Sequence, residues 1–405
     1  MNEPKVTVIL PTRERGDALE HALRTVTAQT YDNLEIIVSD NYSRDRTAEI
    51  ARSTGDARVK YLNTGQRLSM SHNWEFALSH VTAGWVTIIG DDDGLLPGSV
   101  ERIARMIRER PSDVEAIRSE VCFYAWPSVT GSTFGRLSVP LKSGVEMRSC
   151  SEWLAKVMRG RAGYADLPML YTGGYVSSAV VNRIKARTGA FYLSCIPDVY
   201  SAVAIASVME RFLYVHEPLA INGASRHSTG TSQFAVRESA DASPARLFES
   251  EGNIAWHPDV PRCADGSYPP SFQAMVYESY LQSRALRNGA GGDRHAEQLE
   301  LILASAGARE TAIGEWGRRF AAAHQLSFDV IDAKARRRKL WSSGGAAWRR
   351  ATQVINTWSV GSPNLPIENV YEASLVAARV RSATPTRFGN LRRLAGRAVQ
   401  RLRRS

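Results

Sequence analysis

The first hundred residues alternate between short apolar runs and amphipathic segments, and this alternation constrains the fold more than any other feature. Runs rich in Val, Ile and Leu predict strands at residues 6–10, 34–38, 59–62 and 85–89. Apolar residues at helical spacing predict helices at residues 17–26, 45–52, 74–81 and 100–107. Strands and helices that alternate in this way form β-α-β units, so we expect an α/β fold with a mostly parallel central sheet flanked by helices.

The rest of the chain is less regular. Residues 111–235 mix short apolar runs with Pro, Gly and Ser, and we expect them to complete one domain over residues 1–235. Residues 236–272 are rich in turn residues and prolines, which predicts a linker. Residues 273–333 are enriched in Ala, Leu, Glu and Gln, which predicts a helical region, and residues 334–405 form a basic, amphipathic C-terminal region.

Three polar clusters follow predicted strands, at residues 11–14, 39–45 and 90–93. In parallel α/β sheets, ligands bind at the carboxyl ends of the strands, so these clusters are candidate binding residues. The last cluster contains three consecutive aspartates, at 91–93, whose like charges repel. A divalent cation such as Mg²⁺ or Mn²⁺ would relieve that repulsion, because it prefers carboxylate oxygens. A solvated acidic loop with an aspartate as helix cap is the alternative.

The order and spacing of these clusters resemble the family 2 glycosyltransferases, which have the Rossmann-like GT-A fold. Residues 6–13 resemble the first strand and "PTxNR"-type turn of the family, residues 40–47 the "D-D/N-x-S-x-D-x-T" element, and residues 91–93 the D-x-D element. The resemblance implies that residues 1–110 bind a nucleotide sugar and that residues 111–235, where the match is looser, bind the acceptor.

The resemblance also assigns roles to individual residues. The nucleotide sugar would contact Pro11, Thr12, Arg13, Glu14, Asp40, Asn73, Asp91 and Asp92. Asp40 would accept a hydrogen bond from a uracil-type N–H, because a carboxylate only accepts. Asp93, together with Asp92, would hold Mg²⁺ or Mn²⁺ against the diphosphate. The turn at 12–15 reads Thr-Arg-Glu-Arg and departs from the family pattern, which leaves its contacts open, and Asn73 could equally cap a helix.

An inverting transferase needs a general base on the acceptor side, and a carboxylate is the usual choice. In the family this base is an acid at the start of a helix, well downstream of D-x-D. Asp198 fits, because Pro197 precedes it and an apolar run follows. Asp166 is a second choice, and a helix cap without catalytic role is the alternative for Asp198.

His227 lies in a loop of small residues together with an arginine. In several GT-A enzymes a late histidine completes the metal shell, and a neutral imidazole is a good metal ligand. We therefore name His227 as a candidate contact of the metal or of the diphosphate, with a purely structural histidine as the alternative.

The net charge of +10 is concentrated toward the C-terminal end. Residues 334–350 hold seven Lys and Arg and residues 380–405 hold eight Arg, without an acid in either stretch. The rest of the chain has 36 basic and 41 acidic residues, so we expect no nucleic-acid partner. Residues 386–404 place apolar residues at helical spacing opposite arginines, as in helices on anionic membranes. A helix that docks on its own domain is the alternative.

Composition excludes several classes of protein. Apolar residues are 43% and charged residues 23%, as in ordinary globular domains. No stretch approaches the ~18 consecutive apolar residues of a membrane span, and the run at 6–11 is too short for a signal peptide. The four cysteines are far apart, which speaks against a disulfide framework. We expect a cytoplasmic location, peripheral on the inner face of the membrane if the basic segments bind lipid.

The sequence thus predicts a metal-dependent, inverting glycosyltransferase. We expect it to transfer a sugar from a nucleotide sugar, with UDP favoured, to a hydroxyl of a saccharide or lipid-linked acceptor in bacterial surface polysaccharide or glycoconjugate synthesis. A sugar-nucleotide nucleotidyltransferase and a catalytically silent, membrane-associated scaffold are the alternatives. A dinucleotide oxidoreductase is disfavoured, because no G-x-G-x-x-G follows the first strand.

Overall fold

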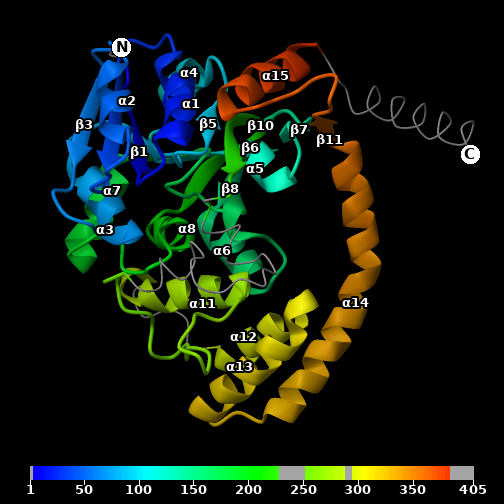
Figure 1. Ribbon diagram of the computed structural model, residues 1–405. Helices are drawn as coiled ribbons and strands as arrows, with labels where there is room; N and C mark the ends of the chain where they lie inside the picture. The colour runs from blue at the N-terminus through cyan, green and yellow to red at the C-terminus, as the bar shows by residue number, and fades with distance from the viewer. Residues whose placement is uncertain (1–2, 227, 229–250, 288–293, 384–405) are drawn as a thin grey trace, which may run out of the picture.

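Four parallel strands form the first half of the central sheet, in a computed structural model that describes residues 3–226, 228, 251–287 and 294–383. The strands are β1 (Val6–Thr12), β2 (Leu34–Asp40), β3 (Val59–Asn63) and β4 (Trp85–Ile88). They lie in the order β3-β2-β1-β4, and each pairing is parallel. The helices that follow them are α1 (Gly16–Thr27), α2 (Thr47–Ser53), α3 (Met70–Ser79) and α4 (Ser99–Glu109). The predicted β-α-β organisation is confirmed (Figure 1).

The side chains of β1 explain why this strand is mostly apolar, with Thr7 as the one polar residue between Val6 and Leu10. Val8 and Leu10 pack into a hydrophobic cluster that includes Leu19 and Leu23 of α1. Ile9 points to the opposite face and joins a second cluster around α3 and the helices beyond it. A strand that is buried on both faces carries apolar residues at every position, and not only at alternate ones.

Beyond β4 the sheet is mixed. The remaining strands are β5 (Gly94–Leu95), β6 (Ala116–Ala125), β7 (Arg136–Pro140), β8 (Val145–Ser149), β9 (Gly174–Ser177), β10 (Arg211–Ala224) and β11 (Thr357–Val360). The order continues from β4 through β9, β6 and β7 to β11, with antiparallel pairings. β10 runs parallel to β6 and antiparallel to β5 and β8. Strands within residues 111–235 thus extend the parallel half into a mixed sheet, and the α/β class is confirmed.

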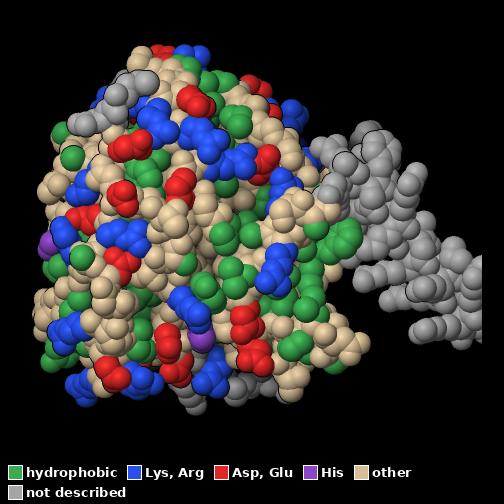
Figure 2. Space-filling model, turned by 90° about the horizontal axis from the view of Figure 1, so that it is seen from above, with side chains coloured by type: hydrophobic (Ala, Val, Ile, Leu, Met, Phe, Trp, Pro, Cys, Tyr) green, Lys and Arg blue, Asp and Glu red, His purple; other side chains and the backbone are tan. Residues whose placement is uncertain are grey.

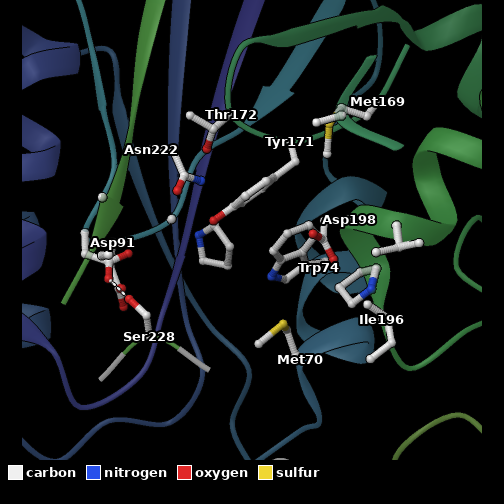
Figure 3. Close-up of a pocket in the computed structure, with 18 of the residues that line it drawn as sticks. Met70, Trp74, Asp91, Met169, Tyr171, Thr172, Ile196, Asp198, Asn222 and Ser228 are labelled. Atoms are coloured by element: carbon white, nitrogen blue, oxygen red, sulfur yellow. Dashed lines mark hydrogen bonds between the residues drawn. The ribbon is translucent and has the colours of Figure 1, made fainter. Parts of the chain in front are cut away.

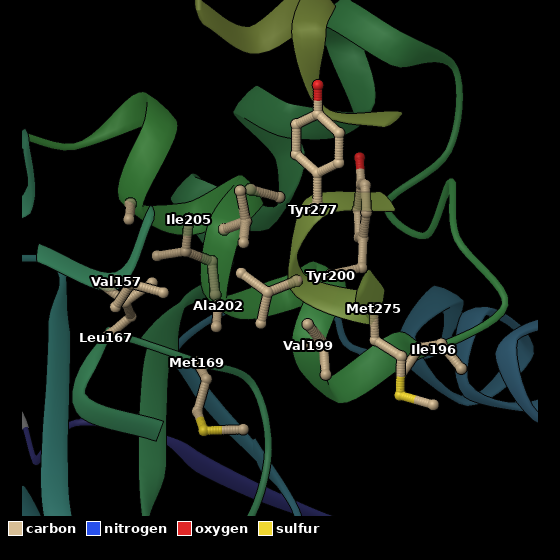
Figure 4. Close-up of a cluster of buried hydrophobic side chains, with 14 of the residues drawn as sticks. Val157, Leu167, Met169, Ile196, Val199, Tyr200, Ala202, Ile205, Met275 and Tyr277 are labelled. Carbon is tan, nitrogen blue, oxygen red and sulfur yellow. The ribbon is translucent and has the colours of Figure 1, made fainter. Parts of the chain in front are cut away.

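The second hydrophobic cluster is centred on α8 (Pro197–Val208), which is buried on nearly all sides. Figure 4 shows Val199 and Tyr200 of α8 beside Met275 and Tyr277 of α11 (Phe272–Gln282). The other helices of this part are α5 (Pro127–Thr130), α6 (Cys150–Met158), η1 (Tyr164–Asp166), α7 (Ser178–Thr188), η2 (Arg284–Arg287), α12 (His295–Ala304), η3 (Gly307–Arg309) and α13 (Glu310–Ala323). Residues 273–333 are thus mainly helical, as predicted.

The chain returns to the N-terminal domain after the helical region. A long helix, α14 (Phe328–Ile355), runs from the level of α12 and α13 to β11 at the edge of the sheet (Figure 1); the side chains of 341–353 are not described. β11 pairs with β7, and α15 (Val370–Ser382) packs against α1. Ile367 and Val370 are fully buried in the same cluster as β1 and α1, so this part of the C-terminal region belongs to the core.

Residues of the predicted linker also contribute to the core. Trp256, Val260 and Tyr268 are buried in the cluster around α8. The domain boundaries drawn from the sequence stay predictions. The predicted cationic helix at 386–404 lies outside the described residues.

The described surface carries mixed charge. The view from above shows Lys and Arg side chains interspersed with Asp and Glu (Figure 2). Within the described residues, no helix is long and apolar enough to cross a membrane. Cys122, Cys150 and Cys195 are buried, and none of these three thiols forms a disulfide bond within the described residues.

Candidate functional site

A cavity of about 620 Å³ opens where the carboxyl ends of β1 and β4 meet the first turn of α8. It has the size of a small-molecule site. Seven of the predicted site residues line it, namely Pro11, Thr12, Arg13, Asn73, Asp91, Asp92 and Asp198. In Figure 3, Asp91 and Ser228 lie on one side of this cavity and Asp198 on the other, with the rings of Tyr171 and Trp74 between them.

The turn after β1 supports the first aspartate of the acidic cluster. Thr12 donates from Oγ1 to Asp91 Oδ2 at 2.9 Å, and Arg15 donates from Nη1 to Asp91 Oδ1 at 2.9 Å. Burial opposes the charge of Arg15, but the Asp91 and Asp92 carboxylates outweigh burial, so the pKa of Arg15 is raised. Burial also raises the pKa of Asp91, although Arg15 and Thr12 stabilise its ionised form.

Of the next two residues in that turn, Arg13 lines the cavity and Glu14 does not. Arg13 lines the cavity and pairs with Glu251, which the sequence did not indicate. Glu14 has a φ of 53°, lies outside the cavity lining, and accepts a hydrogen bond from the Arg44 N–H at 3.1 Å. Its own N–H donates to Ser43 Oγ at 2.8 Å. Glu14 thus holds the turn against the loop after β2, and its contact with a nucleotide stays a prediction.

Asp40 is fully buried at the end of β2 and does not line the cavity. Its carboxylate accepts hydrogen bonds from the Tyr61 hydroxyl at 2.5 Å, from Asn63 Nδ2 at 3.1 Å and from the Ser43 N–H at 2.9 Å. These donors already satisfy much of its capacity as an acceptor. The predicted hydrogen bond to a base N–H stays a prediction.

Asn73 lines the cavity from inside α3 and does not cap this helix. Ser69 is the cap, because its side chain accepts a hydrogen bond from the His72 N–H. The Asn73 side chain accepts from Ser39 Oγ at 2.8 Å, which fixes the amide at the end of β2.

The three aspartates after β4 point in different directions. Asp92 lines the cavity, and its Oδ2 accepts from Ser228 Oγ at 2.5 Å and from the Ser225 N–H at 3.2 Å. Asp93 is fully buried outside the cavity lining.

The Asp93 carboxylate is held by its own chain. It accepts from the N–H groups of Gly90 at 2.8 Å and Gly223 at 2.7 Å, and from the Thr172 hydroxyl. Burial, followed by the Asp92 charge, raises the pKa of Asp93. The geometry therefore favours Asp92 over the predicted Asp93 as the acid available to a metal ion, and the role of Asp93 as a ligand stays a prediction.

Asp198 lies in the first turn of α8 and faces the cavity, as expected for an acid at the start of a helix. The cap residue of α8 is Ile196, so Asp198 is not the N-cap. Tyr164 donates from its hydroxyl to Asp198 Oδ2 at 3.1 Å. Burial raises the pKa of Asp198, while the Val199 N–H and the Tyr164 hydroxyl act in the opposite direction.

Asp166, the second choice for a base, occupies a different environment. It lies in η1, outside the cavity lining, and its Oδ2 accepts from the Gly163 N–H at 3.0 Å. His227 lies outside the described residues, so its predicted contact with a metal or diphosphate stays a prediction.

Aromatic and methionine side chains line the cavity between Asp91 and Asp198 (Figure 3). Trp74 stacks on Tyr171, with ring centroids 5.3 Å apart and an angle of 23° between the planes. Met70, Met169 and Met275 also line the cavity. Stacked aromatic faces and apolar side chains form a dry surface against which a planar or sugar ring packs well.

Several lining residues were not predicted as site residues, chiefly Arg15, Trp74, Arg118, Tyr164, Tyr171 and Glu251. Arg15 could have been found from its place in the same turn as Thr12 and Arg13. The two tyrosines lie in the Gly-containing segment 160–174, which carries no periodic pattern. Arg118 and Glu251 reach the cavity only through the tertiary fold.

The described residues contain no group of three or more His, Cys, Asp and Glu side chains arranged to hold a metal ion. A Mg²⁺ or Mn²⁺ ion that bridges to a diphosphate needs only one or two carboxylates from the protein, because phosphate oxygens and water complete the shell. Asp91 and Asp92 meet that requirement in number, since both residues line the cavity.

Part of the chain is similar to known proteins. Residues 7–150 match the family model described as Glycosyl transferase family 2. The chain carries a family 2 glycosyltransferase domain. The match covers the polar clusters after β1, β2 and β4, and it ends before α8 and Asp198.

Curated relatives are similar to this chain over part of their length. GalNAc(5)-diNAcBac-PP-undecaprenol beta-1,3-glucosyltransferase of Campylobacter jejuni is 35% identical over 109 residues, which are 26% of this chain and 35% of the relative. The uncharacterized glycosyltransferase YibD of Escherichia coli is 25% identical over 191 residues, or 46% of this chain and 52% of the relative. The chain thus matches about a third to a half of the length of these relatives.

Solved structures are similar at the level of the backbone. S. aureus TarS 1-349 in complex with UDP-GlcNAc has a TM-score of 0.46 and 14% identity, covering 82% of this chain and 92% of that chain.

Proposed function

We propose that this chain is an inverting glycosyltransferase that transfers a sugar from a nucleotide sugar to an acceptor hydroxyl. One observation carries the proposal: Asp91 on one side and Asp198 on the opposite side line the same cavity of about 620 Å³, which Asp92 also lines. The family 2 domain and the names of the relatives support it.

The donor would bind at the β1–β4 end of the cavity. Arg13 and Arg15 bring positive charge to the wall that Asp91 and Asp92 form, and a diphosphate needs such charge. Asp92, with Asp91 beside it, would hold Mg²⁺ or Mn²⁺. When bound, such an ion neutralises the charge that develops on the departing nucleoside diphosphate. We favour UDP as the nucleotide, on the resemblance at Asp40.

Asp198 would act as the general base. Its carboxylate takes the proton from the acceptor hydroxyl while that oxygen attacks the anomeric carbon of the donor sugar. The bond from this carbon to the diphosphate oxygen breaks, the nucleoside diphosphate leaves, and the configuration inverts. A carboxylate whose pKa is raised by burial is a better proton acceptor than an exposed one, which suits this role.

A panel of nucleotide sugars tests the proposal. We expect UDP formation from one UDP-sugar, faster with Mn²⁺ or Mg²⁺ and faster still with a saccharide acceptor. Asp198→Asn should lose transfer while it still binds the donor. Failure of UDP-, GDP- and dTDP-sugars alike to bind or react, with either metal, would contradict the proposal and favour the scaffold alternative.

We further propose a saccharide or lipid-linked acceptor of surface polysaccharide or glycoconjugate synthesis, and association with an anionic membrane. The name of the Campylobacter relative, a transferase to a PP-undecaprenol-linked saccharide, supports this choice. Within residues 334–339, Arg336, Arg338 and Lys339 pair with acids of this chain, so the membrane proposal depends mainly on residues 380–405. Deletion of residues 384–405 should weaken sedimentation with anionic vesicles, and unchanged sedimentation would contradict it.

A further inference from the structure

Three arginines line the cavity, and they differ in their ionic partners. Arg13 pairs with Glu251, and Arg15 pairs with Asp91 at 2.9 Å. Arg118 forms no ion pair with any described acid, although only 4% of its surface is exposed. A buried guanidinium without a counter-ion is costly, because its charge has left water and gained no opposite charge in return.

The guanidinium of Arg118 is held firmly in its place. Nε donates to the Ala165 carbonyl oxygen at 2.8 Å, and Nη1 donates to the Thr172 carbonyl oxygen at 2.5 Å. Gly173 leaves the room for it, since a Cβ at this glycine would lie 2.8 Å from Nη1. Two of the five N–H donors of the side chain are thereby used, and the others have no partner among the described residues.

The surroundings of Arg118 add little negative charge. Tyr214, Glu120, Asp166 and Tyr164 act on it only at longer range, and burial outweighs them, so the pKa of Arg118 is lowered from its usual value. An anion bound in the cavity would supply the missing charge through fixed, charge-assisted hydrogen bonds.

The position of Arg118 indicates which part of the substrates it meets. Through Thr172 it is connected to Asp93, since the Thr172 hydroxyl donates to that carboxylate. Through Ala165 it adjoins Tyr164, which donates to Asp198. Arg118 therefore lies between the acidic cluster and the proposed base, where the two sugars would meet, and the diphosphate would lie nearer Arg13 and Arg15.

We propose that Arg118 is a receptor for an acidic group, a carboxylate or a phosphate, on one of the two sugar substrates. This inference rests on the proposed function and specifies it, because it names an acidic sugar as a substrate. The acid is carried either by the sugar that is transferred or by the acceptor sugar, and both would present the same chemistry to the guanidinium.

Calorimetric titration of the full chain with Mn²⁺ distinguishes the two sources. The donor arm compares UDP-glucuronic acid with UDP-glucose. The acceptor arm, at saturating UDP, compares glucuronic acid and glucose 6-phosphate with glucose. We expect an acidic ligand to bind at least ten-fold more tightly than its neutral counterpart in one arm. Equal affinity within two-fold in both arms would overturn the inference.

Variants show whether Arg118 is responsible. Arg118→Gln should abolish the preference and leave the affinity for UDP unchanged, whereas Arg161→Gln, at an exposed site outside the cavity, should keep it. A preference that survives Arg118→Gln would overturn the inference. If that variant does not fold, Arg118→Lys is the substitute. It keeps the positive charge but loses the planar guanidinium with its paired donors, so it should reduce the preference for the acidic ligand.

Binding of UDP itself separates this inference from the proposed function. If UDP binds and no acidic ligand is preferred, only the role of Arg118 fails. If UDP, GDP and dTDP all fail to bind, the proposed function fails.

Discussion

Asp198 is partly buried, lies in the cavity wall and accepts one side-chain hydrogen bond, from the Tyr164 hydroxyl. Replacing it by Asn keeps the shape of the side chain and removes the ability to take a proton. We expect Asp198→Asn to lower turnover by roughly 10²-fold or more, with little change in donor affinity. A steady-state assay combined with donor titration checks this. Asp166→Asn is the matched control and should stay active; a larger loss there would move the base to Asp166.

Tyr164 tunes the proposed base without touching the reacting atoms. Its hydroxyl stabilises the ionised form of Asp198, so Tyr164→Phe should raise the pKa of Asp198 further. Because the base must be ionised, the acidic limb of the kcat/KM profile should move to higher pH. We expect activity at low pH to fall about ten-fold, as for one lost hydrogen bond to a charged group, and to recover in alkaline buffer. A profile that drops equally at every pH would contradict this.

The contact between α8 and α11 contains a buried acid that the reaction does not use. Glu278 of α11 is fully buried, accepts from Ser194 Oγ at 2.6 Å, and has a pKa raised by burial to about 7. The folded chain therefore keeps this proton up to about pH 7, whereas the unfolded chain loses it near pH 4.5. Stability from this group is present at low pH and is lost as the pH rises between these values.

We expect Glu278→Gln to remove that loss. Relative to the variant, the wild type should lose on the order of 3 kcal/mol of unfolding free energy between pH 4.5 and 7. Thermal unfolding of both proteins across this range measures the difference. Tm curves that run parallel would show that Glu278 does not titrate in the folded state as proposed.

Local patterns predicted the early elements well because these elements are determined by local sequence. The apolar runs of β1 to β4 and the helical spacing of α1 to α4 follow from burial on the two faces of the sheet. β5 was not predicted, since it is short, contains a glycine and exists only through pairing with a distant strand. β11 pairs with β7, and α15 packs into the cluster around β1 and α1. Both contacts join segments that are far apart in the sequence, so local patterns do not indicate them.

The site was predicted in position more than in detail. The strand ends predicted the edge of the sheet at which the cavity opens, and Asp91, Asp92 and Asp198 all line that cavity. The sequence could not give the direction of each side chain: Asp93, next to Asp92, is turned into the protein by three hydrogen-bond donors. Arg118 reaches the cavity from a strand whose sequence carries no motif.

The segment between β11 and α15 connects the C-terminal region to the core of the molecule. Ile367 is fully buried with residues of β1 and α1, and its carbonyl oxygen accepts from the Tyr124 hydroxyl at 2.9 Å. We expect Ile367→Ala to lower the unfolding free energy by about 2–5 kcal/mol. Denaturant unfolding measures this, with Leu365→Ala, at a side chain 49% exposed, as the control. Equal effects of the two substitutions would mean that this segment is not part of the cooperative core.

The site as a whole is defined by acids that meet across the cavity, and its donor end can be tested without knowing the acceptor. The measurement is the Tm of the full chain with UDP, with Mn²⁺, and with both, for the wild type, for Asp92→Asn and for Asp32→Asn at an exposed control site. We predict that UDP and Mn²⁺ raise the Tm of the wild type only when both are present. This rise in Tm should be lost in Asp92→Asn and kept in Asp32→Asn. No stabilisation of the wild type by UDP with Mn²⁺, or equal stabilisation of Asp92→Asn, would contradict a UDP-sugar site at Asp91 and Asp92.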